Sequence, residues 1–191
     1  MANVDRPNGF RPVKTVSGGP WTGYVQRVGV ADSADIWVGD AITLSSGLAA
    51  EAATGNEIAG VAIGFGRNVG GTMGAGGDGL PLNFDPSNLE NRYYDDSAST
   101  HTEWFCWYVP ATDIVFAAQT ASAMTLVVGE AVDILPTNGS TTTGISAHEI
   151  TTDSSSDLMV YELPSIPNND LTLTNAEYWV VFINPIHGTL G

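Results

Sequence analysis

Residues 36–44 read IWVGDAITL. Ile42 and Leu44 alternate with smaller or more polar neighbours at the two-residue period of a β-strand, and the apolar positions do not follow the spacing of a helix. Gly39 adopts the positive φ of a tight turn more readily than any residue that carries a Cβ atom. The stretch therefore predicts a strand, a tight turn and a second strand.

A second stretch repeats this pattern. Residues 128–134 read VGEAVDI and match residues 38–44, VGDAITL. Both have Val, Gly, an acid, Ala, a β-branched residue, any residue and an aliphatic residue, and a Gly-containing turn follows each within several residues. Two interpretations remain open: two equivalent corners of a β-barrel, or a common β signature repeated by chance.

Further strand signals recur along the chain between clusters of turn residues. One helical turn is plausible at residues 121–128, and Asn138-Gly139 is a strong hairpin signal. With 22 Gly, 10 Pro and 43% hydrophobic residues, the composition favours an all-β fold, a compact β-sandwich or β-barrel. The other predicted strands lie at residues 24–30, 57–66, 103–110, 114–118, 128–135, 158–163 and 178–183.

The predicted domain organisation has two parts. Residues 1–27 form an extended arm rich in Pro and Gly, and residues 28–191 form a single β-rich domain. An irregular insertion with a long Gly-rich loop occupies about residues 66–100 of that domain, and we expect it at the surface. Large apolar residues in the arm indicate that it docks, either on its own body or on a partner.

Charge is the most informative bulk property. The net charge is −15 and the pI is near 4.1, which disfavours direct binding to nucleic acid or to anionic membranes. The first 27 residues nevertheless carry four of the six basic residues and one acid, whereas residues 93–191 carry twelve acids and no Lys or Arg. Either the whole chain has halophilic-type acidity, or a basic arm binds an acidic partner while the body faces solvent.

The sequence contains no catalytic, metal or cofactor motif that we recognise. His101, His148 and His187 lack metal-site spacing, and neither a Gly-x-Ser-x-Gly elbow nor a Walker loop is present. Cys106, the single cysteine, excludes an internal disulfide and is expected to be buried. The N-terminus lacks the apolar region of a signal peptide, and no stretch is long and apolar enough to span a membrane, which predicts synthesis in a reducing cytoplasm without secretion.

The opening residues carry a resemblance. Residues 1–14 read MANVDRPNGFRPVK and residues 17–21 read SGGPW. They resemble the start of capsid decoration (cement) proteins of tailed phages, in which a Pro-Gly-aromatic-Arg-Pro-Val segment precedes a Gly-Pro element and β-strands. The two VG-acid-A stretches and residues 58–62 are similar to the β-rich cores of those proteins. Arg6 and Asn8 depart from the small or aromatic residues expected around the proline.

This resemblance implies a structural, non-enzymatic virion protein. Such proteins assemble in the bacterial cytoplasm and bind the outer surface of the capsid, commonly as homotrimers and less often as dimers, where they bridge major capsid subunits. It also implies the residues of two surfaces. The capsid contacts would be Arg6, Pro7, Phe10, Arg11, Pro12, Lys14 and Trp21. The aromatic run of Trp104, Phe105, Trp107 and Tyr108 would be either core or oligomer interface.

Three alternatives remain beside the decoration hypothesis. A head fibre or tail protein would have a repetitive shaft, which the sequence lacks. A carbohydrate-binding β-sandwich would use exposed aromatic residues such as Trp21, Trp37, Tyr93 and Tyr94. A carboxylate-based hydrolase is compatible with the many acids, but these lie mainly in polar loops, where solvated carboxylates are the usual case.

Overall fold

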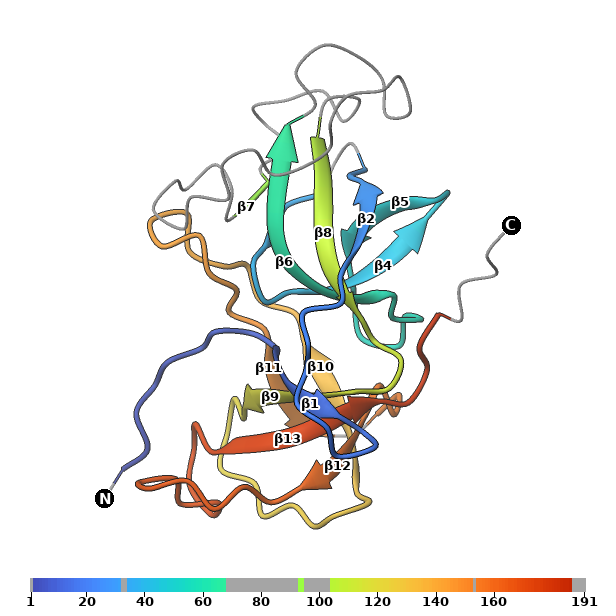
Figure 1. Ribbon diagram of the computed structural model, residues 1–191. Helices are drawn as coiled ribbons and strands as arrows, with labels where there is room; N and C mark the ends of the chain where they lie inside the picture. The colour runs from blue at the N-terminus through green and yellow to red at the C-terminus, as the bar shows by residue number, and fades with distance from the viewer. Residues whose placement is uncertain (1, 32–33, 68–92, 95–103, 153, 187–191) are drawn as a thin grey trace.

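The computed structural model describes residues 2–31, 34–67, 93–94, 104–152 and 154–186 (Figure 1). The predicted all-β fold is confirmed, and these residues contain no helix, hence none that could cross a membrane. Most of the predicted insertion at 66–100, with its Gly-rich loop, lies outside the described residues. The strands are β1 (Arg11–Thr15), β2 (Gln26–Gly29), β3 (Ile36–Trp37), β4 (Ala41–Ser45), β5 (Leu48–Glu51), β6 (Gly60–Arg67), β7 (Tyr93–Tyr94), β8 (Trp104–Pro110), β9 (Ile114–Gln119), β10 (Ala131–Leu135), β11 (Glu149–Thr152), β12 (Leu158–Glu162) and β13 (Glu177–Phe182).

The strands form two main antiparallel sheets in a compact, sandwich-like arrangement. Sheet A has the order β1-β9-β13-β12-β10-β11, and sheet B has the order β2-β8-β6-β4-β5. The short strands β3 and β7 pair separately. Figure 1 shows sheet B in the upper part of the molecule and sheet A in the lower part. Sheet B takes its strands from residues 26–110, the first half, whereas sheet A combines β1 with residues 114–182, the second half.

The two halves have the same topology. When the five sheet strands of each half are numbered along the chain, both sheets read 1-5-4-2-3, with β1 as an addition to the second half. Each sheet also curls, so that the third strand in this numbering contacts the residue that follows the first strand. In the first half this closure is a parallel bridge between Val30 and Ala49, and in the second half it joins Thr120 to Ile150.

The register of the strands agrees in detail. Ala41 pairs with Val61 in the first half, and Ala131 pairs with Met159 in the second. The pairing of the fourth and fifth strands shifts register immediately after the third residue of the fourth strand in both halves, at β6–β8 and at β12–β13. The repeated VG-acid-A pattern therefore marks equivalent corners of two equivalent halves.

Those corners are the same turn. In residues 37–40 the N–H of Asp40 donates to the carbonyl of Trp37 at 3.1 Å, and the Asp40 carboxylate accepts from the Trp37 N–H at 2.7 Å. In residues 127–130, Glu130 makes the same two contacts with Val127, at 3.1 and 2.8 Å. The third residue of each turn is a glycine with a φ near +101° or +88°, which is why the pattern requires glycine there.

The hydrophobic core comprises two clusters. The larger one fills the second half and reaches the facing side of sheet B, and the smaller one lies inside the first half. Along β4, Ala41 belongs to the larger cluster and Ile42 to the smaller, so sheet B is apolar on both faces. Cys106 is buried in the smaller cluster, as expected, and burial raises the pKa of its thiol.

Two local predictions were wrong. Residues 121–128 contain no helical turn. Asn138-Gly139 is not a two-residue hairpin, because β10 and β11 pair across a connection of residues 136–148. Gly139 is required for packing instead, since a Cβ atom there would collide with the ring of Trp37. The two-residue hairpin lies at Ser46-Gly47, where both residues have positive φ between β4 and β5.

Candidate functional site

The predicted arm is partly built into the body. Its residues Arg11–Thr15 form β1, which pairs with β9 at the edge of sheet A. Phe10 is 1% exposed, its ring lies 5.4 Å from that of Phe182, and its N–H donates to the carbonyl of Gly39. Phe10 therefore fills an apolar pocket of this chain and joins the two halves, which corrects the expectation that it contacts a capsid.

The residues before Phe10 lie against the second half. The side-chain oxygen of Gln119 accepts from the N–H of Arg6, and its amide nitrogen donates to the carbonyl of Val4, both at 3.0 Å. Asn3 and Asp170 exchange two hydrogen bonds of 2.8 Å through the Asn3 side chain and the Asp170 backbone. These contacts hold the segment along the surface without burying it.

The three basic residues of this segment differ in their surroundings. Arg11 forms an ion pair with Glu177. Lys14 pairs with Glu162, and its Nζ lies 4.9 Å from the centroid of the Trp179 ring. Both cations are therefore engaged within the chain. Arg6 is exposed and forms no ion pair with any described residue.

Arg6 and Arg11 line one small polar cavity, which we call the cationic notch. Its volume is about 190 Å³, and its walls also include Asn8 and Gly9. Gly9 has a φ of +61°, and a Cβ atom there would collide with the carbonyl oxygen of Gly39, so glycine is required beside the buried Phe10. The remaining walls come from the second half, through Ala118, Gln119 and Glu177.

The other predicted capsid contacts lie apart from one another. Pro7 is half-buried beside the notch, and Pro12 lies in β1 opposite Phe116. Trp21 packs against the larger cluster of its own chain, and its indole N–H is buried. The structure thus brings Arg6, Pro7 and Arg11 to one edge, while Lys14 and Trp21 contact the body.

The aromatic run of β8 divides between core and surface. Phe105 and Tyr108 are buried, whereas Trp104 and Trp107 are half-buried. The Arg27 guanidinium lies over Phe105 and Trp107, at 5.2 and 6.0 Å from the ring centroids. Two of the four residues proposed as core or oligomer interface are therefore core, and the two tryptophans remain partly accessible.

Sequence patterns did not indicate a buried polar cluster of Asp40, Glu51 and His148. His148 lies in the connection before β11 and reaches into the first half, where its Nε2 is 2.8 Å from Glu51 and 3.5 Å from Asp40. Burial raises the pKa of Asp40 to about 6, although the His148 ring and the Ser146 hydroxyl act in the opposite direction. No short spacing links these three residues, so only the fold reveals them.

The geometry of this cluster favours a proton over a metal ion. The N–H of Ala41 donates to Nδ1 of His148 at 3.3 Å, which places the ring proton on Nε2, facing Glu51. A metal on Nε2 would move that proton to Nδ1, directly against the N–H of Ala41. Ser146 accepts from the backbone N–H of His148, so it is not paired with the ring as a nucleophile. The cluster is a hydrogen-bonded link between the halves.

Comparison with known proteins yielded no relative. No protein-family model matches the chain, no curated protein matches it, and no solved structure matches it. The function is therefore inferred from the residues and contacts described above.

Proposed function

We propose that this chain is a non-enzymatic structural protein of a tailed-phage head, a decoration or cement protein. It binds the outer surface of the capsid and bridges major capsid subunits, as a homotrimer or, less favoured, a dimer. The observation that carries the proposal is the cationic notch, where an exposed Arg6 without an ion pair to any described residue lies beside Arg11 on a chain of net charge −15. The resemblance of residues 1–21 to such proteins supports the class.

The notch suits an acidic partner. The guanidinium of Arg6 is a planar fork that binds a carboxylate through two parallel hydrogen bonds. Gln119 and the buried Phe10 already hold the segment around Arg6, so little conformational entropy remains to be lost on binding. Repulsion by the acidic body then orients the protein, because the notch presents positive charge to a negatively charged shell.

A decoration role is also compatible with the small binding energy expected of a single notch. A single exposed arginine contributes little binding energy, but oligomers that contact several capsid subunits gain affinity from multivalency. An acidic exterior keeps a densely covered shell soluble through charge repulsion. The duplicated β fold, with each sheet curled onto itself, provides a compact body for such a role.

Particles that carry this chain provide the direct test, by mass spectrometry and electron microscopy. Hundreds of copies on the shell, with protrusions of three-fold or two-fold symmetry, are expected. A few copies at one vertex, or absence from particles, would overturn the proposal in favour of a tail, fibre or soluble role.

The contribution of the notch is tested with Arg6→Gln, with Arg27→Gln as a matched exposed arginine in the other half. We expect Arg6→Gln to weaken binding to undecorated shells about tenfold and Arg27→Gln less than about twofold. Added salt should weaken the wild-type protein more than Arg6→Gln, because salt screens exposed charge pairs. Equal affinities of the Arg6→Gln and Arg27→Gln variants would show that the notch does not contribute to capsid binding.

A further inference from the structure

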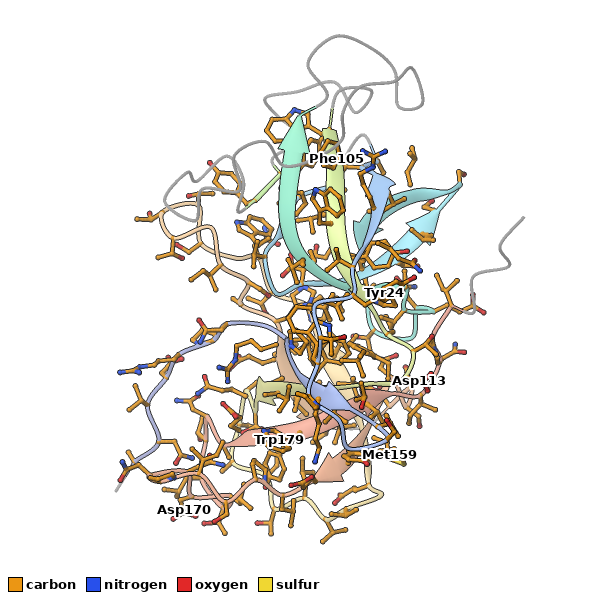
Figure 2. The ribbon with its side chains drawn as sticks, viewed as in Figure 1. Tyr24, Phe105, Asp113, Met159, Asp170 and Trp179 are labelled. Atoms are coloured by element: carbon orange, nitrogen blue, oxygen red, sulfur yellow. The ribbon has the colours of Figure 1, made fainter. Side chains whose placement is uncertain are left out.

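A second cavity lies between the two halves, where β2 and β8 meet the segment between β1 and β2. Its volume is about 470 Å³, within the range of small-molecule sites. Figure 2 labels Tyr24 and Asp113, which lie where the two sheets adjoin. We call this cavity the aromatic pocket, and its principal walls are Trp21, Tyr24, Gln26, Tyr108 and Asp113.

The polar groups of the aromatic pocket are already positioned. The hydroxyl of Tyr108 donates to Oε1 of Gln26 at 2.6 Å, and Nε2 of Gln26 donates to the hydroxyl of Tyr24 at 3.0 Å. Among the described residues, the Tyr24 O–H and the second amide N–H of Gln26 have no acceptor, so both can donate to a ligand. Tyr24 is 63% exposed, an unusual position for a large aromatic ring that is held by a hydrogen bond.

The second half shows that the fold does not require this arrangement. Gln26 and Tyr108 are cross-strand partners on the first and fifth strands of the first half. By register, their counterparts in the second half are Phe116 and Val180, which are also partners and are both fully buried. The second half thus fills this position with apolar core, whereas the first half places a hydrogen-bonded polar pair beside a cavity.

The lining chemistry identifies the class of ligand. Trp21 and Tyr24 offer ring surfaces, Gln26 offers an amide, and threonine hydroxyls stand around them. Asp113 adds a carboxylate from the turn between β8 and β9, at a φ of +62° that few residues other than glycine adopt. In the part of the chain that the structure describes, no Lys or Arg lines the cavity, so these residues offer no counter-charge to a phosphate or a carboxylate-bearing ligand.

We propose that the aromatic pocket binds a short neutral oligosaccharide. Sugar rings present C–H faces that pack on aromatic rings, and their hydroxyls pair with planar amide and carboxylate groups such as those of Gln26 and Asp113. The indole N–H of Trp21 is buried without a hydrogen-bond partner among the described residues, so Trp21 contributes ring surface and not a donor. This site is separate from the cationic notch and does not rest on capsid binding.

The intact protein tests the proposal in two steps. A glycan array that carries neutral, sialylated and sulfated glycans is screened first, followed by calorimetry with maltose, cellobiose, lactose and N,N′-diacetylchitobiose. We expect at least one neutral glycan to bind with a Kd of about 1 mM or tighter, and no preference for anionic glycans. Absence of neutral binders, or selection of anionic ones, overturns the proposal.

Variants then assign the binding to the pocket. Tyr24→Ala and Gln26→Ala should each weaken the neutral glycan at least about tenfold. The matched control is Trp179→Ala, which removes a half-buried aromatic ring of β13 in the second half and should leave affinity unchanged. Unchanged thermal unfolding of Tyr24→Ala, whose ring is exposed, shows that the fold is intact. Glycan binding that survives both pocket variants removes the aromatic pocket from the interaction.

Discussion

The turns at residues 37–40 and 127–130 have the same backbone and the same reciprocal hydrogen bonds but different surroundings. In the first turn, the carbonyl of Val38 accepts from the backbone N–H of Ser146, and the carbonyl of Gly39 accepts from the backbone N–H of Phe10. The first turn therefore joins the two halves. In the second, Val127 and Val128 are each 61% exposed. The comparison shows that a local pattern determines the geometry of a turn, while the segments packed against it determine how much stability depends on that geometry.

The largest effect is expected where the two glycines are replaced. In Gly39→Ala, the new Cβ atom would collide with the carbonyl oxygen of Asn8 and approach Ser146, so we expect a loss of about 3 kcal/mol or more in unfolding free energy. In Gly129→Ala, nothing lies near the new atom, and only the positive φ costs about 1 kcal/mol. Denaturant unfolding measures the stability of both variants. Equal unfolding midpoints would contradict the claim that the first turn is packed against Asn8 and Ser146.

A smaller effect is expected in the pH dependence of stability. The pKa of Asp40 is about 6 in the folded protein and near the ordinary aspartate value of 3.8 in the unfolded chain, so between these pH values the folded state binds more protons. The contribution of Asp40 to stability is therefore complete below about pH 4, falls as pH rises to about 6, and is level above that, a change of roughly 3 kcal/mol.

Asp40→Asn should remove this slope, because an amide does not titrate. The matched variant Glu130→Gln changes the equivalent acid of the exposed turn and should leave the slope in place. Unfolding free energies measured from pH 4 to pH 7 give the comparison directly. A slope that persists in Asp40→Asn would assign the pH dependence to another group, such as Glu149, whose pKa burial also raises.

The smallest effect concerns the valines that precede the two glycines. Val38 is half-buried against the smaller cluster, and Val38→Ala should cost about 1 kcal/mol. Val128 is exposed, and Val128→Ala should change stability by no more than about 0.5 kcal/mol. A larger loss in Val128→Ala, measured by thermal unfolding at several protein concentrations, would indicate that the exposed turn is covered by another copy.

These comparisons also explain which features were predictable from the sequence. Residues 36–44 and 128–135 were correctly expected to contain strands because alternation and a turn glycine are local signals. The glycine of Asn138-Gly139 gave a false hairpin signal. Glycine is needed there because the ring of Trp37, about 100 residues away in the chain, leaves no room for a Cβ atom. Local patterns do not encode such distant contacts.

The candidate site was predicted only in part for the same reason. The apolar residues of the N-terminal segment left two docking partners open, its own body or another protein, and Phe10 is buried in its own body. The notch also needs Gln119 and Glu177 from the second half, and the buried cluster needs His148 opposite Asp40. These pairings depend on how two sheets are placed, which one sequence does not reveal.

The position of β1 has a consequence for synthesis of the chain. The strands of sheet B have been made once residue 110 is complete, but β1 pairs with β9, which lies about 100 residues further along the chain. At translation rates of about 5–20 residues per second, β1 and Phe10 wait roughly 5–20 s on the ribosome for that partner. Although β1 emerges before the other strands of the two sheets, it is therefore among the last to reach its final place, and a nascent chain truncated before β9 exposes it.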